Sequence, residues 1–118
     1  MTGLFRMATF SPTIVDGVRI LHFSGTLNQH GVEELRPALV AEASAGGPLV
    51  LDLAGVDMVN TPGIALLLTA HRGVRQSGGR LVVTGSSAMV NDVLHRCLLD
   101  RILVLVADPS EAVAVAKA

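Results

Sequence analysis

The sequence predicts an α/β fold with a mixed, mostly parallel sheet, an N-terminal β-hairpin and about four helices packed on the sheet. Two strand-like segments flank Asp16-Gly17, a dipeptide typical of tight hairpin turns. The almost continuously apolar run Leu49–Leu53 is typical of a strand buried on both faces. From Leu49 onward, strand-like and helix-like segments alternate, which indicates parallel strands joined by crossover helices.

The segment before Leu49 supplies the hairpin and a first helix. We expect strands at Phe10–Val15 and Val18–Ser24, followed by a polar connection over Gly25–Gly31. Apolar residues then recur at helical spacing, at Val32, Leu35, Leu39 and Ala43. Because an interior proline removes a backbone hydrogen bond and kinks a helix, Pro37 predicts that the regular part of this helix begins later than Gly31.

The rest of the chain repeats the strand–helix unit. The expected elements are the strand Leu49–Leu53, a helix after the turn Asn60–Gly63, the strand Arg80–Thr84, a helix capped by Ser86 or Ser87, the strand Ile102–Val106 and a helix from Asp108 to Ala116. Glycines at 46–47 and 78–79 supply the helix stops. Since no linker or repeat divides the chain, we expect one domain over residues 1–118, with its core at about 10–117 and flexible residues 1–9.

Composition excludes several classes of function. The chain has 118 residues, half of them apolar, and a formal net charge of −1, which suits a globular core. Three aromatic residues and no basic run argue against direct nucleic-acid binding. The lone Cys97 and the lack of a signal-peptide-like apolar run predict a cytoplasmic protein. The apolar runs fall short of the ~20 residues that a membrane span needs.

No constellation of an enzyme or metal site stands out. The soft ligand candidates, which have no ligand-pair spacing with an acidic residue, are His22, His30, His71, His95 and Cys97. The sequence lacks the Gly-x-Ser-x-Gly nucleophile motif, and its glycine-rich turns lack the lysine of a phosphate-binding loop. We therefore expect no enzymatic activity, no metal and no cofactor.

Thr61 is the most informative polar residue. It follows the strand Leu49–Leu53 and stands at the expected start of a helix, where Pro62 fits the first helical position. A helix N-terminus has unpaired N–H groups and partial positive charge, so it favours a capping oxygen or a phosphate. Thr61 is therefore either a helix cap or a phosphate-controlled switch.

The helix after Thr61 is apolar on two faces. Ile64, Leu67 and His71 share the face that we expect to meet the core. On the opposite face lie the small or apolar residues Leu66, Ala70 and Gly73. Either these residues dock a partner protein or they pack against a neighbouring helix, and spacing alone favours neither.

Five segments in the same order resemble the STAS domain, which bacterial anti-sigma factor antagonists share with the cytoplasmic domains of sulphate transporters. These segments are Phe23–Asn28, Val50–Asp57, Asn60–Gly63, Ser77–Val83 and Leu99–Ile102. They span most of the chain. The turn Asn60–Gly63 takes the place of the family's Asp-Ser-Ser-Gly turn.

The resemblance implies an anti-sigma factor antagonist. In such proteins an anti-sigma factor that is also a serine/threonine kinase phosphorylates the first hydroxyl of that turn, and the matching residue here is Thr61. The unmodified form would bind the anti-sigma factor and free a sigma factor, while the phosphorylated form would release it; self-association into a homodimer stays open. The expected partner-binding residues are Asn28, Asn60, Thr61, Pro62, Gly63, Leu66 and Ala70.

Three departures from the family pattern bear on this expectation. Asn28 and Asn60 stand where the family has acidic residues, Pro62 replaces the second serine, and Leu98 replaces a glycine. Loss of two carboxylates indicates either a changed kinase preference or a member that binds without phosphoryl control. The alternative function is an accessory subunit of a larger complex, for lipid transport or signalling.

Overall fold

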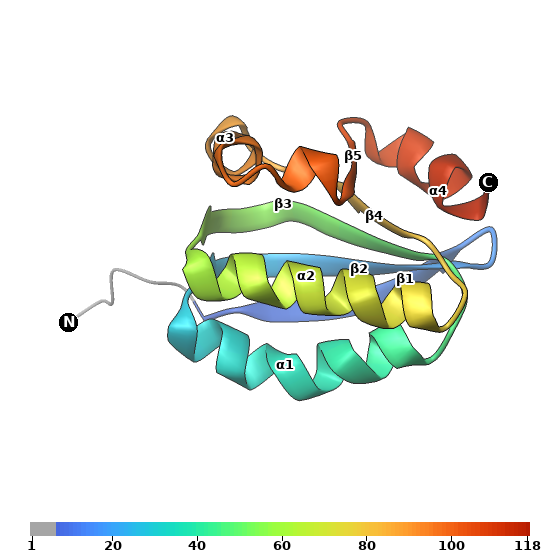
Figure 1. Cartoon of the computed structure of the whole chain (residues 1–118), viewed down its shortest axis with the longest axis horizontal. Coiled ribbons are helices and arrows are strands. Elements are labelled where there is room, and N and C mark those ends of the chain that lie inside the picture. Colours follow the sequence, from blue (N-terminus) through green and yellow to red (C-terminus); the bar gives the residue numbers. More distant parts are fainter. Residues whose placement is uncertain (1–6) are drawn as a thin grey trace.

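The computed structural model describes residues 7–118 and contains a five-stranded sheet flanked by helices (Figure 1). In chain order the elements are β1 (Thr9–Val15), β2 (Val18–Leu27), α1 (Gln29–Ser44), β3 (Leu49–Val59), α2 (Thr61–Gln76), β4 (Leu81–Thr84), α3 (Ala88–Arg96), a 3₁₀ turn (Leu99–Arg101), β5 (Val104–Val106) and α4 (Pro109–Lys117). The strand order is β1-β2-β3-β4-β5; β1 and β2 are antiparallel, and the other pairs are parallel. The predicted fold class is confirmed.

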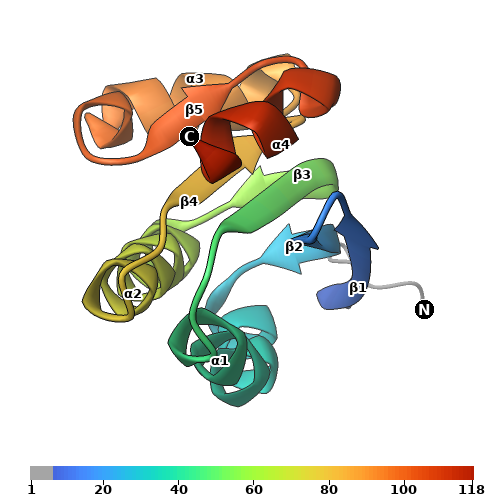
Figure 2. The ribbon, with the colours of Figure 1, turned by 90° about the vertical axis from the view of Figure 1, so that its right-hand side faces the viewer.

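The helices form two layers on the sheet. Helices α1 and α2 lie side by side on one face, and α3 and α4 lie on the opposite side (Figures 1 and 2). Alternating strand residues serve the two layers: Leu49 and Leu51 belong to the larger apolar cluster with α1 and α2, whereas Val50 packs with α4. This alternation explains why Leu49, Leu51 and Leu53 are apolar toward one layer while Val50 is apolar toward the other.

Several boundaries differ from the predicted ones. Strands β2 and β3 continue to Leu27 and Val59, well past the predicted ends. Helix α1 begins at Gln29 and runs through Pro37, so the predicted late start is wrong. Pro37 lies on the exposed side of α1, where the carbonyl that loses its partner can turn to water.

Several turns and helix caps agree with the predictions from the sequence. Asp16 and Gly17 both have positive φ, 52° and 78°, as a tight hairpin turn with two left-handed residues requires. Ser87 caps α3 by accepting a hydrogen bond from the N–H of Val90. Asp108 caps α4 by accepting from the N–H and hydroxyl of Ser110, and these bonds hold the pKa of its carboxyl below the ordinary value.

Two further observations concern the ends of elements. Leu98, after α3, has φ 61°, a left-handed conformation that favours glycine. The expected flexible segment, residues 1–9, lies mostly outside the described residues, but Ala8 is only 4% exposed and Thr9 already belongs to β1. No helix within residues 7–118 combines the length and apolarity that crossing a membrane would require.

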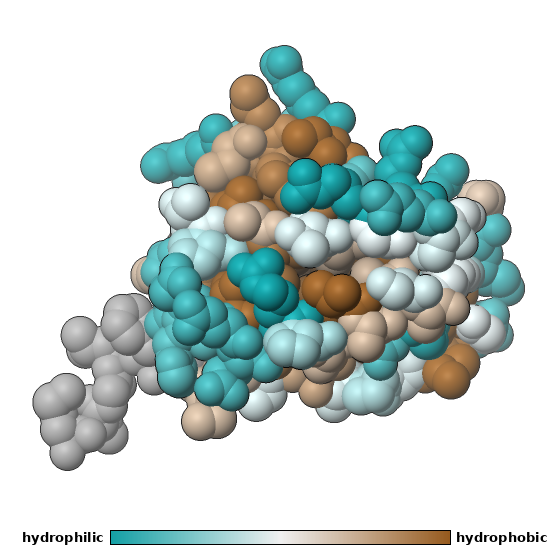
Figure 3. Space-filling model, turned by 60° about the horizontal axis from the view of Figure 1, so that its bottom comes forward, coloured by the Kyte–Doolittle hydropathy of each residue, from teal (hydrophilic) through white to brown (hydrophobic). Residues whose placement is uncertain are grey.

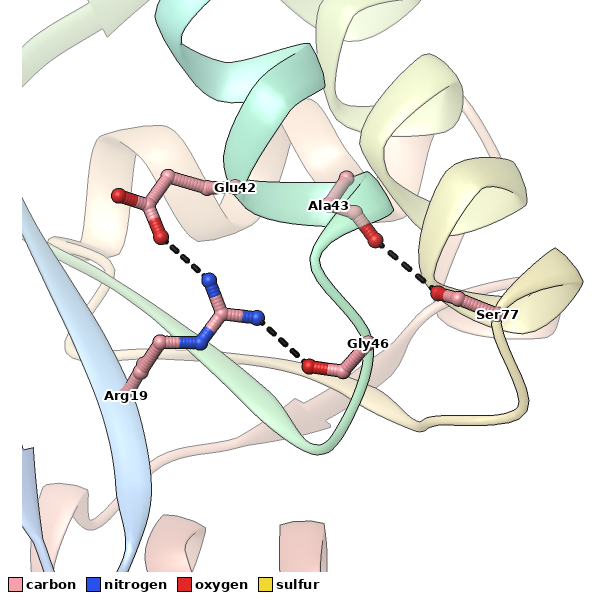
Figure 4. A network of polar contacts seen from close by, with 5 residues as sticks. All are labelled: Arg19, Glu42, Ala43, Gly46 and Ser77. Atoms are coloured by element: carbon pink, nitrogen blue, oxygen red, sulfur yellow. Dashed lines mark hydrogen bonds and ion pairs between the residues drawn. The ribbon is translucent and has the colours of Figure 1, made fainter.

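Polar contacts close the end of the molecule at which the parallel strands begin (Figure 4). The Arg19 guanidinium on β2 pairs with the Glu42 carboxylate on α1 and donates to the Gly46 carbonyl at 2.9 Å. The Ser77 hydroxyl, after α2, donates to the Ala43 carbonyl at 3.1 Å. The ends of α1 and α2 are thereby tied together, which leaves the opposite end of the sheet for the candidate site.

Candidate functional site

The candidate site lies where β2 and β3 end and α1 and α2 begin (Figure 1). Leu27 and Val59 are register partners in these parallel strands, and the N–H of Asn60 donates to the Leu27 carbonyl at 3.0 Å. The predicted site residues Asn28 and Asn60 therefore stand on two adjacent turns. The carboxyl ends of parallel strands are the usual place for binding sites in α/β folds.

The two asparagines cap their helices differently. Asn28 is the N-cap of α1, and its Oδ1 accepts a hydrogen bond from the N–H of Gly31 at 2.9 Å. Asn60 is the N-cap of α2 by backbone conformation, but its side chain makes no capping hydrogen bond. Asn28 is therefore held in place by α1, while the Asn60 amide is available to a partner.

Thr61 is the first residue of α2, and its side chain is exposed. Of the two roles expected for Thr61, that of helix cap is wrong, because Asn60 occupies the cap position one residue earlier. Pro62 is accordingly the second helical residue rather than the first. Within residues 7–118, the Thr61 hydroxyl makes no hydrogen bond, so it is free to face solvent or another protein.

Three predicted contact residues do not lie on the surface. Leu66 and Ala70 are 0% and 1% exposed and belong to the apolar cluster that α2 shares with α1. Of the two readings of this face, packing against a neighbouring helix is the correct one. Gly63 is also buried: a Cβ there would lie 2.8 Å from the Leu27 carbonyl oxygen and 2.8 Å from Cγ1 of Val59. It allows α2 to start directly against β2 and β3.

The exposed side of α2 is a different set of residues. Thr61, Ala65, Arg72 and Gln76 are exposed at intervals of four and seven and form one face, here named the outer stripe of α2. On the side of the molecule that carries α1 and α2, hydrophobic residues form patches separated by hydrophilic residues (Figure 3). A partner that binds here meets a mixed polar surface.

One apolar residue near Thr61 was missed from the sequence. Met58, near the end of β3, is 41% exposed, and its register partner on β2 is Thr26. The predicted strand ends at Leu53, so the sequence does not place Met58 on a strand beside the turn Asn60–Gly63. The signal in the sequence is the pair of β-branched residues Val56 and Val59, both of which the structure buries.

The site favours an anion. The first turns of α1 and α2 contain no acidic residue, so the partial positive charge of both helix N-termini is not neutralised there. The carboxylate of Asp57, three residues before Asn60, accepts a hydrogen bond from the Thr26 hydroxyl at 2.7 Å. Asn28 and Asn60 add no charge. A phosphate on Thr61 would therefore meet favourable helix ends.

Polar side chains on another part of the sheet form a hydroxyl–imidazole–carboxylate chain. The Thr13 hydroxyl and one oxygen of Asp52 lie 2.8 Å from Nε2 and Nδ1 of His22, respectively. The other oxygen of Asp52 accepts from the N–H of Ala54. These contacts join β1, β2 and β3, which is a structural role. Within residues 7–118, no group of three or more His, Cys, Asp or Glu side chains is placed to hold a metal.

His71, on α2, is held in its neutral form. Burial, with help from the nearby charges of Arg75 and Arg72, lowers the pKa of its imidazole below the ordinary 6.5. The unfolded chain takes up a proton at about pH 6.5, whereas the folded chain resists it until lower pH. Unfolding is therefore favoured as the pH falls through this window.

We expect the His71→Gln variant to lose less stability than the wild type between pH 7.5 and 5.5. Urea unfolding at both pH values measures this difference. His30→Gln, at an exposed position on α1, is the matched control and should keep the wild-type pH dependence. An equal loss of stability in the wild type and His71→Gln would contradict the assignment.

Comparison with known proteins adds independent information. A model of the STAS domain family matches residues 9–113. A protein of Bordetella bronchiseptica named as an anti-sigma factor antagonist, BtrV, is 30% identical over 82 residues, which cover 69% of this chain and 71% of BtrV.

Solved structures share the fold. An anti-sigma factor antagonist from Thermotoga maritima has a TM-score of 0.81 at 24% identity and covers 92% of this chain and 95% of its own. The Bacillus cell fate determinant SpoIIAA, in its phosphorylated form, has a TM-score of 0.65 at 18% identity and covers 90% and 97% of the two chains. At these identities the likeness shows the architecture.

Proposed function

Because the chain belongs to the STAS domain family of anti-sigma factor antagonists, we propose that it binds an anti-sigma factor of the serine/threonine kinase type and so releases a sigma factor. Members of this family are regulatory proteins rather than enzymes. Such a kinase uses ATP, so the proposed function places the chain in the cytoplasm. DNA is affected through the sigma factor and not by direct contact.

The binding surface in this proposal combines two adjacent turns with the outer stripe of α2. Asn28, Asn60, Thr61 and Pro62 surround the helix start, and Met58 adds an exposed apolar side chain. The single observation that carries the proposal is the position of Thr61. It is exposed at the first residue of α2, beside the turn that holds Asn28.

Phosphorylation of Thr61 would regulate this binding. The γ-phosphoryl group of ATP passes to Oγ1 of Thr61, ADP leaves, and the hydroxyl proton goes to a base of the kinase. The new group carries about −1.5 to −2 charges, which the α2 N-terminus stabilises within the free chain. A docked partner would have to desolvate or repel this charge, so the phosphorylated form is released.

Asn28 and Asn60, which stand where the family has acidic residues, affect the proposed regulation. Carboxylates at positions 28 and 60 would repel a phosphate on Thr61, whereas Asn28 and Asn60 do not. The change therefore favours the phosphorylated form of the free chain. It also removes two charges that a kinase could recognise.

The outer stripe of α2 gives a test of the surface. Ala65→Arg places a long charged side chain in the middle of this stripe, and we expect it to weaken binding to the kinase anti-sigma factor of the same organism by at least about tenfold. Ala38→Arg, at an exposed position on α1, is the control and should bind as the wild type does. Isothermal titration calorimetry measures both affinities.

The same experiment addresses the alternative function. Absence of binding between the wild type and any kinase anti-sigma factor of the organism would contradict the proposal. Co-purification with a transporter complex instead would support an accessory subunit.

A further inference from the structure

A β-bulge interrupts β3 just before the candidate site. Gly25 and Thr26 are adjacent on β2. Their register partners on β3 are Val56 and Met58, which leaves Asp57 as an extra residue between them. An extra residue of this kind bends its strand and changes the direction of the side chains around it. Asp57 therefore does not follow the regular alternation between the two faces of the sheet.

The bulge leaves two consecutive side chains of β3 exposed. Val56 and Val59 are each 3% exposed, and both belong to the larger apolar cluster with α1 and α2. In a regular strand, residues three apart would point to opposite faces. Between these two valines, Asp57 and Met58 are both exposed. Since β3 ends where α2 begins (Figure 1), Asp57 adds a carboxylate beside the proposed binding surface, which already includes Met58.

The Asp57 carboxylate is held in place but is not neutralised. Its Oδ1 accepts a hydrogen bond from the Thr26 hydroxyl at 2.7 Å, and Thr26 is only 2% exposed. A buried residue of β2 therefore orients the exposed carboxylate. None of the ion pairs within residues 7–118 includes Asp57. Because a carboxylate can accept about four hydrogen bonds, it retains acceptor positions for another protein.

We propose that Asp57 is the acidic contact of the binding surface and pairs with an arginine or lysine of the anti-sigma factor, an inference that rests on the proposed function. Asn28 and Asn60 stand where the family has acidic residues, so these two positions supply no carboxylate. Asp57 lies three residues before Asn60, about 10 Å along β3. A stable interface covers about 800 Å² on each partner, a patch about 30 Å across, which can include both residues. A carboxylate that is already oriented loses little freedom on binding.

Asp57→Asn tests the charge, because the amide oxygen can still accept from the Thr26 hydroxyl. Calorimetric titrations with the kinase anti-sigma factor of the same organism are done in low and in high salt. In low salt we expect this variant to bind at least about fivefold more weakly than the wild type. In high salt its affinity should be within about twofold of the wild type, since salt screens an exposed charge pair.

Asp16→Asn is the matched control. It removes the same charge from the hairpin turn at the other end of β2, and asparagine suits the left-handed conformation of this position. We expect it to bind as the wild type does at both salt concentrations. Equal weakening by both variants would overturn the proposal, because the net charge and not the position of Asp57 would then be responsible.

The salt dependence separates this contact from the proposed function. A wild type that binds no kinase anti-sigma factor of the organism would overturn the proposed function and the contact with it. If the wild type binds, two results would overturn the contact alone. One is an unchanged affinity of Asp57→Asn in low salt. The other is weakening by the same factor in low and high salt, which would indicate a change of shape rather than a lost charge.

Discussion

Gly63→Ala is expected to destabilise the protein by about 1–3 kcal/mol, because the new methyl group has no room. Its Cβ would lie 2.8 Å from the Leu27 carbonyl oxygen, 2.8 Å from Cγ1 of Val59 and 2.9 Å from Cβ of Leu27. Since one of these atoms belongs to the backbone of β2, the start of α2 must move away from the sheet. Urea unfolding measures the change in the free energy of unfolding.

Gly73→Ala is the matched control on the same helix. A Cβ at position 73 would lie 3.1 Å from the methyl group of Ala43, a tight contact with one side-chain atom on α1. Alanine also favours a helix over glycine by about 1 kcal/mol, which offsets this contact. We expect its stability to stay within about 1 kcal/mol of the wild type. A Gly63→Ala variant as stable as the wild type would contradict the packing described at the start of α2.

Thr61→Glu is expected to weaken binding to the kinase anti-sigma factor by about a hundredfold or more, the effect of burying an unpaired charge in an interface. The glutamate is tolerated in the free chain, because the first turn of α2 favours a negative charge. The variant should therefore be at least as stable as the wild type and yet fail to bind. Calorimetry for binding and urea unfolding for stability separate the two effects.

Thr61→Gln is the control for the size of the side chain. Glutamine and glutamate have nearly the same shape, so a steric effect would weaken binding equally in both variants. We expect Thr61→Gln to bind within about tenfold of the wild type. Equal affinities for Thr61→Glu and Thr61→Gln would show that charge at this position does not control the interaction.

Much of the fold could be predicted because its signals are local. The pair Asp16-Gly17 fixes the hairpin, and Ser87 and Asp108 mark helix starts by their own side-chain hydrogen bonds. The run Leu49–Leu53 identifies a strand covered on both faces. These features depend on neighbours in sequence, which spacing and residue type describe well.

The ends of the strands could not be predicted in the same way. Beyond Leu53, β3 alternates irregularly between buried and exposed residues, and its pairing with β2 shifts register after His22 and after Gly25. Such bulges depend on the partner strand and not on the local pattern. Because β3 continues to Val59, Met58 lies near the end of this strand, next to the turn that carries Asn60 and Thr61.

The buried face of α2 differs from the predicted one because of contacts with a second helix. Because α2 packs on both the sheet and α1, its buried arc includes Leu66 and Ala70 as well as Leu67. His71, expected on the core face, lies beside it and lines a cavity. A helix with apolar residues on two faces does not reveal which of them meets a second helix.

The N-cap residue of α2 also differs from the expected one. Asn60 and Thr61 are both favourable N-cap residues and are adjacent, so residue preference does not choose between them. The structure places Asn60 at the cap and leaves the Thr61 hydroxyl exposed. For the proposed switch this position is the better one, since a kinase needs access to that hydroxyl.

The central claim is that phosphate on Thr61 switches off binding to a kinase anti-sigma factor. The most direct measurement incubates the complex of the two proteins with ATP and follows the phosphorylated peptide by mass spectrometry and the complex by size-exclusion chromatography, with Thr61→Val as the control. We predict one phosphate, at Thr61, together with dissociation of the complex, and neither change in Thr61→Val. A complex that stays intact with Thr61 phosphorylated, or a Thr61 that gains no phosphate, would contradict the claim.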